Sequence, residues 1–180
     1  GTQETLEADQ FISSMPVKDL VEAMDTEQQP VPSDMRHIAE GLPYRDFVTV
    51  GLLVKHLKLK NTTDIPTLGN PPIVPDCWIY VQDPGYKVCR LQIFNNWSPY
   101  LVKDVDDTVW IGLEYFCEEG DEFWNMSDED ATQFAIHELT SLRVTAGPDD
   151  VPDSHRQRVN KAYLAYLDTY DQLPALVEYL

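Results

Sequence analysis

Two stretches of the chain combine residue types that suit the binding or conversion of a small molecule. The first is residues 94–100, FNNWSPY, in which amides, a hydroxyl and aromatic rings follow one another. Stacking surfaces and hydrogen-bond donors at neighbouring positions suit a sugar or another planar polar ligand. A tight Asn-rich turn with Trp97 packed into the core explains the same residues equally well. Both interpretations stay open at this point.

The second stretch is residues 114–122, EYFCEEGDE, which carries five carboxylates. Their spacing differs from the D-x-[DN]-x-[DN]-G pattern of a calcium loop. Glu114 also lacks a second carboxylate at a separation that suits acid–base hydrolysis of a glycoside. The sequence therefore favours a solvated hairpin tip at residues 118–122.

Self-contained catalytic motifs are absent from the sequence. It has no G-x-G-x-x-G, no phosphate-binding P-loop, no G-x-S-x-G and no H-E-x-x-H, and its four histidines stand far apart. We therefore assign no catalytic, metal-binding or cofactor-binding residue within this chain.

Strand-like alternation gives a stronger indication of where a ligand would bind. Residues 47–57 are apolar enough to predict a strand covered on both faces, and residues 77–82, 88–94 and 109–117 alternate with a period of two. If these strands are neighbours, one sheet face carries Trp78, Tyr80, Gln82, Arg90, Gln92, Trp110 and Glu114. Exposed rings of this kind usually mark a ligand site or a contact with another domain. With the first stretch added, the substrate-binding candidates are Arg90, Gln92, Asn95, Trp97, Tyr100, Trp110 and Glu114.

The elements around these strands predict the fold class. Hydrophobic spacing, caps and turn residues indicate a short strand at 9–14, a helix from Val17, a helix capped by Ser33 and ending at Gly41, a loop at 61–76, a helix from Ser127, a strand at 158–167 and a final helix to Leu180. The expected fold is α+β, with a largely antiparallel mixed sheet and helices packed on one face.

Charge and cysteine content limit the partners and the compartment. Thirty-one acidic residues against thirteen basic ones give a net charge of −18, which argues against nucleic acid and anionic membrane surfaces as partners. Three scattered cysteines indicate free thiols in a reducing compartment. No apolar run is long enough to cross a membrane. We therefore expect a cytoplasmic protein.

Several blocks of the sequence resemble one group of flavoenzymes. These blocks are residues 44–54, the run WIYVQDPGYKVCRLQIFNNWSPYLV from Trp78, the run WIGLEYFCEEGDEFWNMSDED from Trp110, VNKAYLAYLDTY from Val159, and the opening ADQFISSMPV. Together they resemble FAD-dependent oxidoreductases of the flavin amine oxidase and protoporphyrinogen oxidase-like superfamily, close to UDP-galactopyranose mutase-like proteins. The blocks WIYVQDPG and FNNWSPY are fairly specific to that group.

The resemblance implies an internal fragment of a two-domain flavoprotein. Residues 1–16 would be a remnant of the FAD-domain edge and crossover, and residues 17–180 a substrate-binding domain inserted between absent FAD-binding segments. FAD would belong to the parent protein and not to this fragment, which would be inactive alone. The implied partners are the missing FAD domain and a small-molecule substrate, which includes sugar nucleotides. A stand-alone carbohydrate- or protein-binding module is the alternative.

Overall fold

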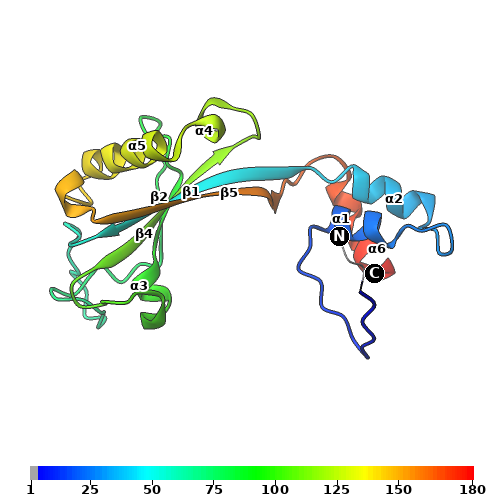
Figure 1. The fold of residues 1–180 in the computed structure, drawn as a ribbon, viewed down its shortest axis with the longest axis horizontal. Helices are drawn as coiled ribbons and strands as arrows, with labels where there is room; N and C mark the ends of the chain where they lie inside the picture. The colour runs from blue at the N-terminus through cyan, green and yellow to red at the C-terminus, as the bar shows by residue number, and fades with distance from the viewer. Residues whose placement is uncertain (1–3) are drawn as a thin grey trace. The chain divides into compact units, whose positions relative to one another are not determined.

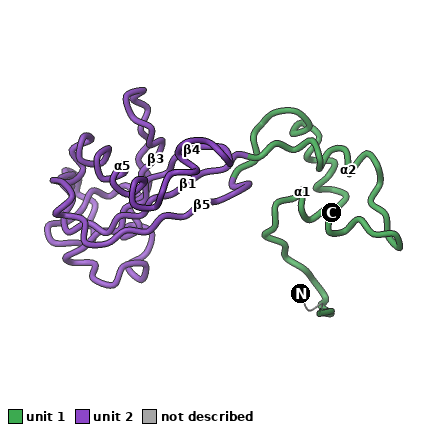
Figure 2. The backbone as a smooth tube through the Cα atoms, turned by 45° about the horizontal axis from the view of Figure 1, so that its top comes forward, with its two compact units in different colours: residues 1–44, 163–180 green, residues 45–162 purple. Residues whose placement is uncertain are grey.

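The computed structural model describes residues 4–180 and divides the chain into two compact units (Figure 2). The helical unit consists of the chain up to Tyr44 together with Tyr163–Leu180, and the sheet unit is Arg45–Ala162. The assignment of residues 17–180 to one substrate-binding domain stays a prediction.

A five-stranded sheet forms the sheet unit, in the order β2-β3-β4-β1-β5 (Figure 1). Its strands are β1 (Tyr44–Val54), β2 (Trp78–Tyr80), β3 (Arg90–Ile93), β4 (Val109–Cys117) and β5 (Asp153–Leu164). The pairs β1–β4, β3–β4 and β2–β3 are all antiparallel. The predicted α+β class with a largely antiparallel sheet is therefore confirmed.

One face of the sheet forms the hydrophobic core, beneath helices α4 (Glu122–Asn125) and α5 (Asp128–Ser141) (Figure 1). Every second residue of β4, and of β1 from Val48 onward, points into this core and is buried, as the period of two requires. Helix α5 begins where the sequence predicts, because the Ser127 hydroxyl accepts a hydrogen bond from the Asp130 amide at 3.0 Å.

The prediction that β1 is covered on both faces is wrong. Val48, Val50, Leu52 and Val54 are fully buried on the core side, but the residues between them are only half-buried. On this second face the cover includes single side chains such as the Trp110 ring, 3.3 Å from where a Cβ atom on Gly51 would stand.

Two buried charged side chains connect α4 and α5 to other segments of the sheet unit. The Glu138 carboxylate accepts hydrogen bonds from the backbone amides of Lys87, at 2.5 Å, and Val88, at 3.1 Å. Burial first, and then the nearby Glu138 charge, raise the pKa of the Tyr115 hydroxyl. The Arg156 guanidinium, from β5, donates to the carbonyl oxygens of Phe123, Trp124 and Met126, which lie in and after α4.

The helical unit packs around a small apolar core of its own. It contains α1 (Val17–Met24), α2 (Ser33–Glu40), the short η3 turn (Asp168–Gln172) and α6 (Leu173–Tyr179). The buried residues that they share are Val21, Val31, Ile38, Ala39, Leu42 and Leu176. Ser33 does not cap α2 as predicted: Pro32 occupies the cap position and no side chain caps the helix.

Two of the predicted strands, at residues 9–14 and 158–167, need correction. Residues 9–14 form no strand, and Phe11 and Ile12 are 76% and 99% exposed, because no neighbouring strand pairs with this segment. The last strand begins at Asp153 and ends at Leu164, instead of spanning residues 158–167. As an edge strand with mostly exposed side chains, β5 lacks the apolar alternation that would have marked its start.

Within residues 4–180, no helix is both long and apolar enough to cross a membrane.

Candidate functional site

The strand register brings the predicted polar and aromatic face together. Trp78 pairs with Gln92, Tyr80 pairs with Arg90, and Arg90 pairs with Glu114 across neighbouring strands. Directly paired residues of an antiparallel sheet project to the same side. The residues between them, such as Leu91, Ile93 and Leu113, lie in the helix-covered core. The strand pairing is therefore not shifted by one residue, which would exchange the two sets. We call the six residues Trp78, Tyr80, Arg90, Gln92, Gly112 and Glu114 the ladder face.

A buried charge cluster lies at the centre of the ladder face. Glu114 is 1% exposed, and its carboxylate accepts a hydrogen bond from Arg90 Nε at 2.8 Å. Arg90 Nη2 and the side-chain amide of Gln92 also donate to the two carboxylate oxygens. The carboxylate and guanidinium thus neutralise each other, and Gln92 occupies the second carboxylate oxygen. The cluster supplies shape and polarity without a net charge.

Aromatic rings surround this cluster and remain open to solvent. The Arg90 guanidinium lies over the Trp78 ring, 4.9 Å from its centroid, and 5.8 Å from the centroid of Tyr80. Trp78 meets Trp97 edge to face, with centroids 5.1 Å apart. Trp78, Tyr80 and Trp97 are 43%, 63% and 47% exposed. Cation–π and edge-to-face contacts fix the rings while leaving much of their surface available.

Two glycines allow aromatic rings to approach the middle of the sheet closely. Gly51 and Gly112 pair directly across β1 and β4. A Cβ atom on Gly112 would stand 3.0 Å from the Phe94 ring, and one on Gly51 would stand 3.3 Å from the Trp110 ring. Phe94 and Trp110 therefore border the ladder face because the strands carry no side chain at these two positions.

Some residues of the 94–100 stretch are buried and hold the backbone in place, and others are exposed. Its first residues form the short helix α3 (Phe94–Trp97). Asn95 is 1% exposed, donates to the Thr108 carbonyl at 2.9 Å, and accepts from the Trp110 amide at 3.0 Å. Its amide is thus occupied by the backbone at the start of β4. Trp97 is not packed into the core, and Tyr100 is 96% exposed.

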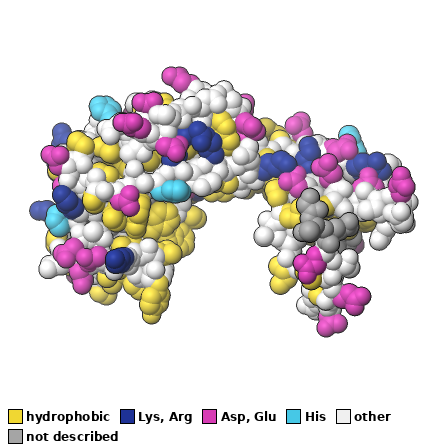
Figure 3. All heavy atoms as spheres, viewed as in Figure 1, with side chains coloured by type: hydrophobic (Ala, Val, Ile, Leu, Met, Phe, Trp, Pro, Cys, Tyr) yellow, Lys and Arg dark blue, Asp and Glu magenta, His cyan; other side chains and the backbone are white. Residues whose placement is uncertain are grey.

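Hydrophobic side chains gather on the side of the sheet unit where α3 lies (Figure 3). Strand alternation places Trp78 and Tyr80 on this face but does not single them out as binding residues. Their exposure and their contacts with Arg90 add them to the site. The signal that identifies them is the pairing of β2 with β3, which the sequence alone does not specify.

Residues 118–122 of the acidic stretch are largely exposed, as predicted, but they form the turn from β4 into α4 and not the tip of a hairpin. Asp121 caps α4 by accepting hydrogen bonds from the amides of Trp124, at 2.9 Å, and Glu118, at 3.0 Å. Although burial opposes the effect, these two hydrogen bonds lower the pKa of Asp121. Over residues 4–180, no three His, Cys, Asp or Glu side chains are grouped to hold a metal ion.

No protein-family model and no curated protein matches the chain. Among solved structures, UDP-galactopyranose mutase in its reduced form is similar over 97% of this chain and 33% of its own, with a TM-score of 0.59 and 19% identity. A protoporphyrinogen oxidase from Exiguobacterium sp. 255-15 is similar over 91% of this chain and 32% of its own, with a TM-score of 0.55 and 14% identity. The chain thus spans about a third of the length of either protein. At these identities the shared property is the fold.

Proposed function

We propose that the chain is the substrate-binding part of an FAD-dependent oxidoreductase or mutase, with the ladder face as one wall of the substrate site. The observation that carries the proposal is the open, aromatic-lined face of a sheet whose opposite face forms the hydrophobic core. The fold similarity to a mutase and an oxidase, over most of this chain, supports it. The sequence blocks that resemble the flavin amine oxidase superfamily support it independently.

The residues of this chain do not fit FAD as a cofactor that the chain would hold by itself. A flavin dinucleotide is usually held by backbone amides at a glycine-rich turn from a strand into a helix. Gly120 stands at such a turn, from β4 to α4, with a φ of 95°. However, Glu118, Glu119, Asp121 and Glu122 flank it and would repel the diphosphate. We therefore assign FAD to parts of the protein other than this chain.

The role proposed for this chain is to bind and orient the substrate. Rings at Trp78, Tyr80 and Trp97 offer stacking surfaces, and the Arg90–Glu114 pair holds two of them in place. Trp110 and Tyr100 extend the aromatic surface, while Asn95 positions the strand on which Trp110 stands. The names of the two structural neighbours supply the first substrates to assay, UDP-galactopyranose and protoporphyrinogen.

Removal of one ring should reduce catalysis without affecting the flavin. In the protein encoded by the complete reading frame, we expect Trp78→Ala to lower kcat/KM about tenfold, the factor that corresponds to about 1.4 kcal/mol of lost stacking. Steady-state kinetics and the flavin absorbance are measured on the same sample. Tyr166→Ala removes a still more exposed ring, 79% against 43% for Trp78, from the helical unit and should change neither quantity. An unchanged kcat/KM in Trp78→Ala would show that the ladder face is not the substrate wall.

A stand-alone carbohydrate- or protein-binding module remains the second candidate function. The observation that favours it is Tyr100, which is 96% exposed next to Trp97 and makes no contribution to the core. A module of this kind would bind its partner without flavin. The two candidates therefore differ in whether the complete protein contains a flavin.

A further inference from the structure

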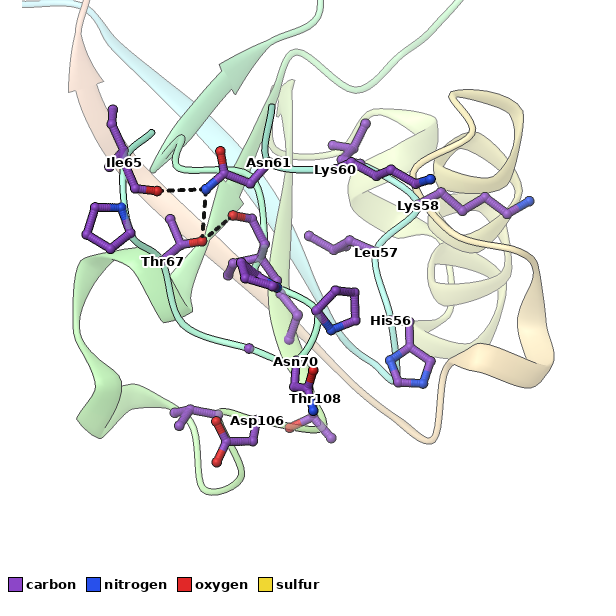
Figure 4. A pocket seen from close by; sticks show the side chains of 18 of the residues that line it. His56, Leu57, Lys58, Lys60, Asn61, Ile65, Thr67, Asn70, Asp106 and Thr108 are labelled. Atoms are coloured by element: carbon purple, nitrogen blue, oxygen red, sulfur yellow. Dashed lines mark hydrogen bonds between the residues drawn. The ribbon is translucent and has the colours of Figure 1, made fainter. Parts of the chain in front are cut away.

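A hollow of about 870 Å³ lies away from the ladder face, where β1 leaves the sheet (Figure 4). Residues 55–61 form one wall, the 63–73 loop forms the second, and residues 105–109 close the third side. None of these segments carries a residue of the ladder face. The properties of the hollow are therefore independent of the function proposed for the ladder face.

The loop wall is held in place by its own hydrogen bonds. The Asn61 side chain donates to the Ile65 carbonyl at 2.8 Å and accepts from the Thr63 amide at 2.9 Å. The Thr67 hydroxyl donates to the Ile73 carbonyl at 2.6 Å (Figure 4). Lys60 and Ile73 form an isolated β-bridge. A loop with this many internal contacts presents a preformed surface, which is typical of small-molecule sites.

The floor of the hollow is apolar. Ile73 and Val109 are 5% and 4% exposed, and both belong to the core of the sheet unit. Leu57 and Leu59 pack against the same core from the first wall. A ligand that fills this hollow therefore needs an apolar body.

The first wall carries the most basic segment of a strongly acidic chain. Lys55, His56, Lys58 and Lys60 lie within six residues of one another, although acidic residues outnumber lysines and arginines by 31 to 13. Lys55 donates to the Asp149 carbonyl at 2.9 Å. Lys58 and Lys60 are exposed and form no ion pair with any residue from 4 to 180. Unpaired lysines next to a hollow are available to an anion from outside the chain.

Charge is separated across the hollow. Lys58 and Lys60 extend in the same direction from the first wall, away from Ile65 and Thr67 of the second wall (Figure 4). Asp64 and Asp106 belong to the other two sides. The flexible four-carbon stems of the lysines allow their charges to reach over the mouth. An anionic group is thus favoured at the lysine rim and disfavoured at the opposite side.

We propose that this hollow is a second binding site of the chain, for a small organic anion with an apolar body and one carboxylate or phosphate group. The body lies on Leu57, Ile73 and Val109, and the anionic group pairs with Lys58 and Lys60 at the rim. The site holds one molecule in a defined orientation, because only one of its sides is basic.

The test uses matched probes and the isotopically labelled 180-residue chain. 2-Naphthoate is the anionic probe, and 2-naphthalenemethanol is its uncharged analogue of the same shape. Amide shifts in a titration followed by nuclear magnetic resonance give both the site and the affinity. We expect shifts at residues 57–61, 69–73 and 105–109, and naphthoate affinity about fivefold higher than that of the alcohol, as expected for one exposed ion pair.

Two variants separate the contributions of charge and of the hollow. Lys58→Gln combined with Lys60→Gln should bind both probes equally, whereas Lys103→Gln, an exposed lysine outside the walls, should keep the fivefold preference. Val105→Phe fills the hollow without changing any charge. It should lower the affinity for both probes about tenfold, because their apolar contact is lost. Equal binding of the two probes to the unaltered chain would overturn the proposal. So would shifts confined to the ladder face, or the absence of shifts at millimolar probe.

Discussion

Glu114→Leu is expected to lower the free energy of unfolding of the sheet unit by about 3–5 kcal/mol, the usual cost of breaking a buried ion pair. The substitution leaves the Arg90 guanidinium, which is 9% exposed, without its carboxylate, and it also removes the acceptor of Gln92. Urea denaturation followed by tryptophan fluorescence measures the effect. All four tryptophans lie in the sheet unit, so the signal reports on that unit alone.

A double variant tests whether the lost stability comes from the buried Arg90 charge that has no carboxylate partner. Arg90→Met combined with Glu114→Leu removes both charges and should recover most of the lost stability, because a buried pair replaced by apolar groups is often nearly neutral. Glu118→Leu, at an exposed position of the same sheet unit, should change the stability by no more than about 0.5 kcal/mol. If the double variant is as unstable as Glu114→Leu, the pair has another role in the fold.

Arg156→Met should produce the second large loss, about 3 kcal/mol or more, because it removes three hydrogen bonds from a buried guanidinium to carbonyl oxygens, together with its ion pair to Asp128. The Arg156 side chain is fully buried, and its guanidinium bonds the carbonyls of Phe123 and Met126 at 2.7 Å and of Trp124 at 2.9 Å. Arg156→Lys should recover little, since one ammonium group lacks the planar fork that reaches all three oxygens.

Arg158 provides a graded control for this prediction. Its Nε also donates a hydrogen bond to the Trp124 carbonyl, at 2.7 Å. The Arg158 side chain, however, is 39% exposed. Arg158→Met should therefore cost about 1 kcal/mol. Urea denaturation ranks the three variants. Equal losses for Arg156→Met and Arg158→Met would mean that burial of the guanidinium is not what stabilises α4.

The sequence predicts the ladder face because strand alternation is a local property. Residues 77–82, 88–94 and 109–117 each repeat with a period of two, and the register confirms that Trp78, Tyr80, Arg90, Gln92 and Glu114 share one side. It does not predict that Arg90 and Glu114 pair with each other, because that contact depends on which strands become neighbours.

The features that sequence analysis missed depend on contacts between distant segments. Arg156 lies in a polar stretch that resembles a loop, and its role appears only when β5 lies against the end of α4. Asn95 resembles a ligand-binding amide, yet it bonds backbone groups of residues 108 and 110. The strand expected at residues 9–14 has strand-forming residues but no partner strand, which shows that composition alone does not make a sheet.

An absorbance spectrum decides whether this chain is the substrate-binding part of a flavin enzyme. The 180-residue chain and the protein encoded by the complete reading frame are purified in parallel, and the flavin bands are compared at equal protein concentration. We expect a colourless chain and a yellow complete protein with about one flavin per polypeptide. A complete protein without flavin, or a stoichiometric flavin spectrum from the 180-residue chain alone, would refute the proposed function.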